Sequence, residues 1–197
     1  MLTRELIVRT AIDLGLTEVS MRGLARHLGV EAPSLYHHVS DRDDLLRAGV
    51  QLLTETIEAP NDDLEWSVWL EELAHIVRRW ALETPGATVL GETGPIGERT
   101  LGILATGMAK LREAGWSAAL ASQSLAMVTN LAMHSAARQL QWERDLADDA
   151  FGRRVEDAPI DPSLAEFVAH YRSADAEEMF AFELGCVLSG LEGRLRP

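Results

Sequence analysis

The stretch S-M-R-G-L-A-R-H-L-G-V-E-A-P-S-L-Y-H-H-V, residues 20–39, decides the fold of this 197-residue chain. Ser20 is a candidate N-cap, because its hydroxyl can accept a hydrogen bond from a free N–H group of a first helical turn. Gly29 suits the left-handed conformation that ends many helices. Pro33 suits the first turn of a following helix, where no N–H donor is needed. The stretch therefore predicts two short helices joined by a tight turn.

The two predicted helices each have a buried and an outward side. Leu24 and Leu28 share one side of the first helix, and Leu35 and Val39 lie four residues apart on the second. The second helix is expected over residues 33–38. Its outward side chains can all form hydrogen bonds and none is acidic: Ser34, Tyr36, His37 and His38.

Helical periods run through the whole chain, and no segment alternates β-branched residues as a strand does. A helix over residues 3–14, with Leu6 and Leu14 among its inward residues, would complete a three-helix head. A longer helix over residues 42–57 leaves this head. The sequence therefore predicts an all-α fold, with a helix-turn-helix DNA-binding domain in residues 1–47 and a larger helical ligand-binding and dimerisation domain in residues 48–197.

Five further helices are expected in this second domain, over residues 64–84, 98–114, 118–144, 163–172 and 175–195. The last of them is apolar over so wide an arc that both of its sides should be buried. In a chain of this size, the second side can be covered by another subunit.

The charge of the chain is unevenly distributed. The net charge is −13, but residues 1–47 carry six arginines against seven acidic residues, so that the remaining −12 falls on residues 48–197. The head also holds three of the six histidines. A DNA-binding head on an acidic body fits this division, although a head at −1 is less basic than such domains usually are.

Several functional classes are excluded by what the sequence lacks. There is no nucleophile elbow, P-loop, dinucleotide-binding glycine motif, HExxH or CxxC, so we expect neither an enzyme nor a cofactor. His37 and His38 would point about 100° apart on a helix and would not easily share a metal. Cys186 is the only cysteine, and no secretory or membrane-spanning segment is visible, which indicates a cytoplasmic protein.

A helix-turn-helix unit binds DNA by placing its second helix in the major groove. His37 and His38 can meet phosphates or base edges. Side chains placed for phosphate oxygens are Ser34, Tyr36 and Arg42, and Arg22 is placed for a phosphate or a base. The same packing also occurs in proteins that never touch DNA, and Tyr36 could belong partly to the core.

These residues also carry a family resemblance. The pieces L-A-x-x-L-G-V and P-S-L-Y-x-H-V, in this order, resemble the DNA-binding head of TetR-family transcriptional repressors. The segments E-W-S-V-W-L, T-P-G-A-T-V-L-G and L-R-E-A-G-W-S are similar, more weakly, to the body of the tetracycline-repressor subgroup. The resemblance implies an all-helical homodimer with a four-helix interface and a ligand pocket in each body.

Carried over by position, the resemblance implies a set of DNA-contacting residues. Ala32 stands where the tetracycline repressor has an amide that reads a base, so the operator should differ there. Arg42 replaces a lysine and keeps a phosphate contact. The full set is Met21, Arg22, Ala32, Pro33, Ser34, Tyr36, His37, His38 and Arg42.

The pocket departs further from the subgroup. Leu90 stands in place of the histidine of the magnesium-tetracycline site, and Arg138 in place of a glutamate, so we expect no metal and no metal-chelated tetracycline. Large or adaptable side chains with a few polar groups could line an apolar pocket, although Trp and Met at helical spacing are also common in plain cores. The candidate ligand-binding residues are Trp69, His75, Trp80, Leu90, Thr93, Met108, Trp116, Met127, Asn130 and His134.

The sequence thus predicts a ligand-responsive transcriptional regulator, most simply a repressor. As a homodimer it would bind palindromic double-stranded operator DNA and be released by a small apolar or aromatic effector. The alternative is a small-molecule sensor or carrier that acts through a protein partner without specific DNA binding. The near-neutral head and the missing amide at Ala32 support that alternative.

Overall fold

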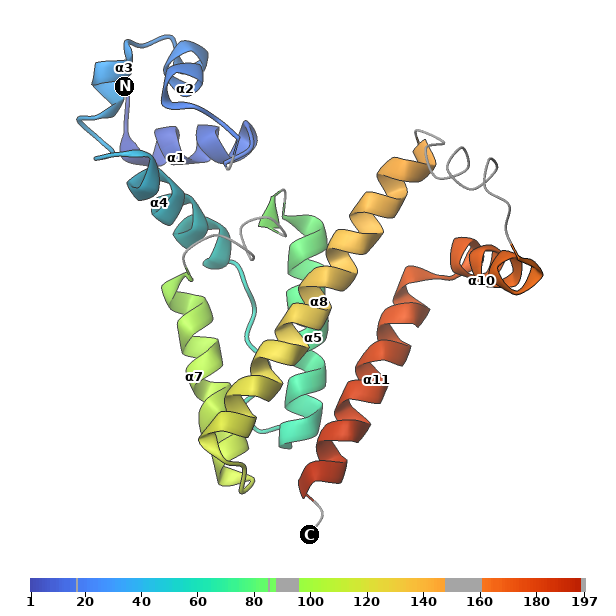
Figure 1. Cartoon of the computed structure of the whole chain (residues 1–197). Helices are drawn as coiled ribbons and strands as arrows, with labels where there is room; N and C mark the ends of the chain where they lie inside the picture. Colours follow the sequence, from blue (N-terminus) through green and yellow to red (C-terminus); the bar gives the residue numbers. More distant parts are fainter. Residues whose placement is uncertain (17, 85, 88–95, 148–160, 196–197) are drawn as a thin grey trace.

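The computed structural model describes residues 1–16, 18–84, 86–87, 96–147 and 161–195. Every regular element in these ranges is a helix. A small head and a larger body are joined by a single helix, α4 (Arg42–Thr54), which runs from one into the other (Figure 1). The prediction of an all-α fold with a three-helix head is confirmed.

The head consists of α1 (Arg4–Asp13), α2 (Met21–Leu28) and α3 (Ala32–Leu35), with the first part of α4 packed against them. Its core is formed by Ile7, Val8, Ala11, Leu24, Leu35, Val39, Leu45 and Val50. The expectation that Leu6 and Leu14 face inward is wrong, since they are 44% and 36% exposed. The buried side of α1 is centred on Ile7 and Ala11, and Leu14 already lies beyond the last helical residue.

The corner between α3 and α4 is built from reciprocal backbone capping. The Asp41 carboxylate accepts a hydrogen bond from the Asp44 N–H (2.7 Å), and the Asp44 carboxylate accepts one from the Ser40 N–H (2.9 Å). Such pairing satisfies donors that a helix start leaves without partners. Arg4 of α1 adds two hydrogen bonds to the Asp44 carboxylate (2.7 and 2.9 Å) and one to the His38 carbonyl (2.7 Å). The Arg4 side chain therefore fixes α1 against the end of the α2–α3 unit.

These contacts shift the ionisation of both partners. The hydrogen bonds from the Arg4 guanidinium and the Ser40 N–H hold the pKa of Asp44 well below its usual range. The Asp44 carboxylate in turn raises the pKa of Arg4. A carboxyl group whose pKa is lowered on folding stabilises the folded state above its unfolded pKa of about 3.9, and this contribution is lost as the pH falls below that value.

We therefore expect Asp44→Asn to lower the free energy of unfolding at pH 7 by about 1 kcal/mol, with the effect kept small by solvent screening of the exposed Arg4 side chain. The difference from the unmodified protein should shrink as the pH is lowered through about 4 towards 3. Urea unfolding at a series of pH values measures this. Asp43→Asn, in the same helical turn, is the control and should lower the free energy of unfolding at pH 7 by less, because Arg4 and Ser40 bind Asp44 and not Asp43. Equal losses for the two variants at pH 7 would contradict the account.

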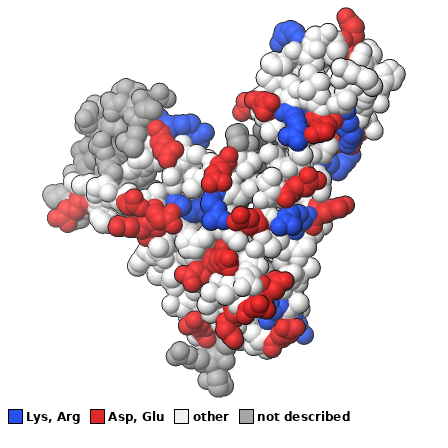
Figure 2. All heavy atoms as spheres, turned by 180° about the vertical axis from the view of Figure 1, so that it is seen from behind, with Lys and Arg blue, Asp and Glu red and all other residues white. Residues whose placement is uncertain are grey.

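The body is built from α5 (Trp66–Glu83), α7 (Glu98–Glu113), α8 (Ala118–Ala147) and α11 (Ala176–Leu195), while α10 (Pro162–Ser173) lies to one side (Figure 1). α5 and α8 pack against each other and both contact α7 and α11. Trp69, Leu70, Leu73, Leu111, Trp116, Leu125, Val128, Phe180 and Leu184 form the centre of this core. On the face shown in Figure 2, carboxylates predominate over the body.

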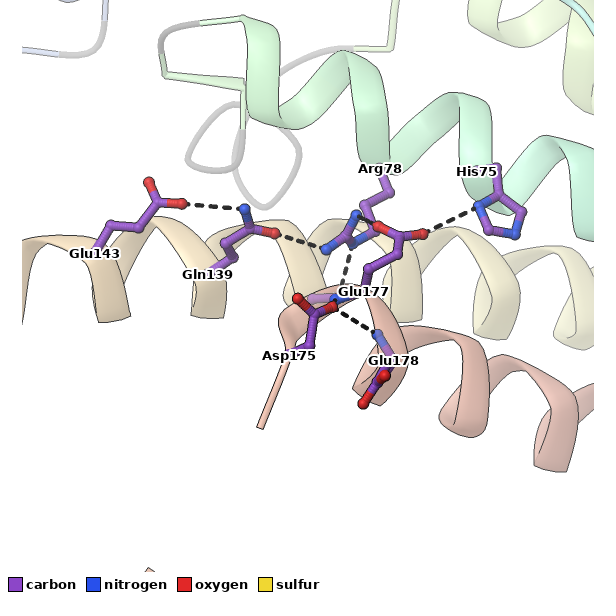
Figure 3. A network of polar contacts seen from close by, with 8 residues as sticks. His75, Arg78, Gln139, Glu143, Asp175, Glu177 and Glu178 are labelled. Carbon is purple, nitrogen blue, oxygen red and sulfur yellow. Dashed lines mark hydrogen bonds and ion pairs between the residues drawn. The ribbon is translucent and has the colours of Figure 1, made fainter. Parts of the chain in front are cut away.

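A buried arginine joins three body helices. The Arg78 side chain of α5 is only 7% exposed and donates hydrogen bonds to Ser135 Oγ (3.2 Å) and Gln139 Oε1 (2.6 Å) of α8. It also forms an ion pair with Glu177 at the start of α11, and its guanidinium lies 5.0 Å from the centre of the Phe180 ring. Figure 3 shows the polar partners converging on Arg78 from both sides. Arg78 therefore links α5, α8 and α11 through polar contacts, in addition to the apolar core that the three helices share.

Candidate nucleic-acid interface and ligand cavity

The α2–α3 unit is held by the features that the sequence indicates. The Ser20 hydroxyl accepts a hydrogen bond from the Gly23 N–H (3.0 Å). Gly29 has φ +66°, and the Val30 N–H donates to the Ala25 carbonyl (3.0 Å), so that the chain reverses immediately after α2. A left-handed residue at this point suits glycine because it has no Cβ.

The second helix is shorter than expected, because α3 ends at Leu35 rather than at His38. The Tyr36 N–H bonds the Pro33 carbonyl (3.2 Å) and the His38 N–H bonds the Leu35 carbonyl (2.9 Å), so the chain tightens into three-residue turns. Leu35 and Val39 are both buried, as predicted, and hold this turn against the head core. The polar residues after Leu35 are therefore presented on a tight, anchored turn rather than on a helix.

The predicted DNA-contacting residues lie on or near the surface of this unit. Tyr36 is 51% exposed although it is a large aromatic residue. Exposed members of the set are Arg22, Pro33, Tyr36, His37 and Arg42, and partly buried members are Met21, Ala32, Ser34 and His38. The hydrogen bond from Arg4 to the His38 carbonyl fixes the backbone on which Tyr36, His37 and His38 stand.

A cavity of about 410 Å³ lies among α4, α5, α7 and α8. None of its lining residues within the described ranges is charged. The indole N–H of Trp80 donates to the Leu53 carbonyl (3.2 Å) and so fixes one wall of the cavity between α5 and α4. The remaining walls include Val50, Thr54, Ile57, Val77, Ile96, Thr100, Leu104, Met108, Leu125, Thr129, Asn130 and Met133.

The structure brings some of the predicted ligand-binding residues together in this cavity and not others. Trp80, Met108 and Asn130 line it. Trp69 and Trp116 instead lie fully buried in the body core, and His75 faces Glu177 and the edge of Phe180 between α5 and α11. Met127 and His134 are exposed on α8, away from the cavity lining, and Leu90 and Thr93 lie outside the described residues.

Sequence reasoning missed the contribution of α4 to the cavity. Val50, Leu53 and Thr54 of α4 line it, together with Ile57 just after this helix, whereas the sequence indicated only a long helix that leaves the head. The sequence held a signal for this contribution, because the apolar side of the predicted helix over residues 42–57 extends further than a three-helix head can cover. Val50 in fact belongs to the head core and also lines the cavity.

The start of α7 is in close contact with α4. A Cβ on Gly97 would come within 2.1 Å of Thr54 Oγ1, so only glycine allows this approach. The Glu98 N–H donates to Gln51 Oε1 (3.1 Å), and the Arg99 side chain bonds the Ile57 carbonyl. The cavity wall formed by α7 is therefore attached to the same helix that enters the head.

Two family models match the chain. The model of bacterial regulatory proteins of the tetR family covers residues 6–48, and that of the tetracyclin repressor-like C-terminal domain covers residues 59–195. The second alone spans more than half of the chain. The chain belongs to the TetR family. It is thus a DNA-binding transcriptional regulator and not an enzyme.

Individual TetR proteins resemble it along nearly their whole length. The class A tetracycline repressor from transposon 1721 of Escherichia coli is 28% identical, over 95% of this chain and 89% of that protein. A possible TetR-family regulator from Streptomyces coelicolor A3(2) superposes with a TM-score of 0.79 at 28% identity, covering 96% of this chain and 98% of that one. ActR without ligand, also from Streptomyces coelicolor, gives 0.78 at 25% identity, with full coverage of both chains.

The described residues were also searched for membrane-spanning helices and for metal-binding groups of side chains. None of their helices is long and apolar enough to cross a membrane. No group of three or more His, Cys, Asp or Glu side chains among them is arranged to hold a metal ion.

Proposed function

We propose that this TetR-family regulator is a repressor that binds a palindromic operator as a homodimer in the cytoplasm and is released by an uncharged, largely apolar or aromatic molecule. The observation that carries the proposal is that Val50 belongs both to the head core and to the lining of the cavity. A molecule that fills the cavity thus touches the helix on which the head is mounted. To release DNA, it must bind more tightly to the arrangement of α4 that does not fit the operator.

The head supplies the DNA contacts in this proposal. The turn after α3 enters the major groove, with Tyr36 and Ser34 on phosphates and His37 and His38 on phosphates or base edges. Arg22 and Arg42 neutralise phosphates at either side, and Met21, Ala32 and Pro33 complete the contact surface. The division of labour follows the helices, with residues 1–47 for DNA and residues 48–197 for ligand and dimerisation.

The homodimer forms through the outer sides of α8 and α11. Phe180 and Leu184 of α11 are buried within the protomer, whereas Phe182 on the opposite side is 74% exposed. A large exposed aromatic side chain on an otherwise apolar helix is typical of a protein interface. Two heads related in this way would reach half-sites about 34–36 Å apart, one turn of DNA.

The DNA-binding part of the proposal predicts a loss of affinity on changing Tyr36. We expect Tyr36→Phe, which keeps the ring, to weaken binding to the preferred duplex about tenfold, because a hydrogen bond to a charged phosphate is lost. Fluorescence anisotropy at fixed salt measures this, with Arg9→Gln, on the exposed side of α1, as the control that keeps its affinity.

The Tyr36 variants test the assigned contact, and the binding of the unmodified protein separates the two functional classes. Loss of affinity on all sequences alike identifies Tyr36 as a phosphate contact. Unchanged affinity of Tyr36→Phe and of Tyr36→Ala would contradict the assigned contact. A protein that acts only through a protein partner would show no preferred duplex at any salt concentration.

A further inference from the structure

The Arg4 side chain contacts both ends of the turn that follows α3. Its guanidinium donates to the His38 carbonyl (2.7 Å) in this turn and to both oxygens of the Asp44 carboxylate (2.7 and 2.9 Å) in the first turn of α4. The Asp44 carboxylate also accepts a hydrogen bond from the Ser40 N–H (2.9 Å), which lies between the two. Arg4 and Asp44 thus bracket the segment that the proposed function places in the major groove.

The other side of this turn is anchored by the head core. Leu35 and Val39 are buried there, and the Val39 N–H donates to the Leu35 carbonyl (3.0 Å). Burial of apolar side chains has no preferred direction, whereas the paired hydrogen bonds between an arginine and a carboxylate also fix an orientation. The Arg4–Asp44 pair therefore supplies an orientation toward α4 that burial alone does not define.

The charges of the pair suit a supporting role rather than a contact with DNA. A carboxylate close to phosphate-binding side chains repels DNA when it has no counter-charge. The Asp44 side chain is 18% exposed, but its charge is balanced by the Arg4 guanidinium at 2.7 Å. Both terminal nitrogens of Arg4 donate to protein acceptors, the His38 carbonyl and the Asp44 carboxylate. The pair can therefore hold the turn without adding net charge to the DNA-binding surface.

We infer that Arg4 and Asp44 are positioning residues for operator recognition, which orient the turn carrying Tyr36, His37 and His38 without contacting DNA themselves. This inference rests on the proposed function, since it concerns the same DNA-binding head. Hydrogen bonds to base edges specify sequence and depend on accurate placement, whereas phosphate contacts carry no sequence information. Loosening the pair should therefore lower the preference for the operator more than it lowers binding to DNA in general.

Asp44→Asn separates positioning from charge, because the two predict effects of opposite sign. Removal of a negative charge near phosphates should strengthen binding to any duplex. Loss of the pair should instead weaken binding to the preferred duplex about tenfold, because a loosened turn must be ordered in each of two heads. Asp43→Asn removes the same charge from the neighbouring, exposed position. It is the control and should bind at least as tightly as the unmodified protein.

Fluorescence anisotropy of the full-length chain measures this on two duplexes. One is the inverted repeat enriched from a random-sequence pool, and the other is a scrambled duplex of the same length and composition. Asp44→Asn should lose affinity for the selected duplex and not for the scrambled one.

A double variant, Arg4→Met with Asp44→Asn, removes the pair without changing the net charge. It should lose affinity for the selected duplex as Asp44→Asn does, with an unchanged dependence on salt. If Arg4 contacts a phosphate directly, the double variant would instead bind both duplexes more weakly, and its salt slope would fall by about one per head. That result would overturn the inference.

Ile7→Val provides a matched loss of stability in the head. Ile7 is fully buried in the head core, and shortening it should lower the melting temperature by an amount similar to that for Asp44→Asn. It should keep the preference for the selected duplex. The inference is overturned if Ile7→Val loses this preference equally, or if Asp44→Asn binds the selected duplex as tightly as Asp43→Asn does. An unmodified protein that prefers no duplex would refute the proposed function and this inference together, so the two failures are distinguishable.

Discussion

Replacement of Arg78 by Met is expected to lower the free energy of unfolding by about 3 kcal/mol. The guanidinium bonds Ser135 and Gln139 of α8 and pairs with Glu177 of α11 while its side chain is 7% exposed. Removing it leaves the buried Ser135 hydroxyl without its donor and opens space beside Phe180. Since the Glu177 side chain is 58% exposed and can be hydrated, the loss should fall short of that for a fully buried ion pair.

The neighbouring arginine provides the matched control. Arg79 makes a single ion pair with Glu58, and both side chains are exposed, so Arg79→Met should cost less than about 1 kcal/mol. Urea unfolding of both variants, followed by circular dichroism, gives the comparison. Similar losses for the two variants would mean that Arg78 does not hold α5, α8 and α11 together in the way its contacts indicate.

Addition of a single methyl group at Gly107 should have the second-largest effect. A Cβ at this position of α7 would lie 2.7 Å from the Trp69 ring and 2.8 Å from a Leu125 methyl group. Both side chains are fully packed in the body core and cannot move aside freely. We expect Gly107→Ala to destabilise the protein by about 1–3 kcal/mol, because the loss from overpacking exceeds the gain in helix propensity.

Gly102→Ala tests the same substitution in the same helix without the steric conflict. Nothing lies within 4 Å of a Cβ at Gly102, which is exposed. The variant should therefore be more stable by about 0.5–1 kcal/mol, the propensity difference between glycine and alanine in a helix. Thermal unfolding of the two variants should give shifts of opposite sign, and a stabilising shift for Gly107→Ala would contradict the close packing of α7 on α5 and α8.

The local signals in the sequence predicted the head well. Ser20 and Gly29 act on their own or adjacent turns, so their caps can be read without knowing the fold, and both occur in the structure. The length of α3 could not be read in this way. Tyr36 and its neighbours have helical spacing, but the chain tightens after Leu35 to bring Val39 into the head core.

The cavity was harder to predict, because it depends on how helices are rotated against one another. Trp69 and Trp80 lie on the same helix and have the same chemistry, yet one is in the core and the other lines the cavity. The role of α4 likewise depends on where α7 docks, which the Gly97–Thr54 contact decides.

Selection of duplexes from a random-sequence pool is the measurement that tests the central claim most directly. The unmodified protein should enrich one inverted repeat whose half-site centres are separated by one turn of DNA or a multiple of it, at an affinity that falls as salt is raised. That result would establish a dimer that reads sequence through two heads. Enrichment of no sequence at any salt concentration, while the protein remains folded, would contradict the account.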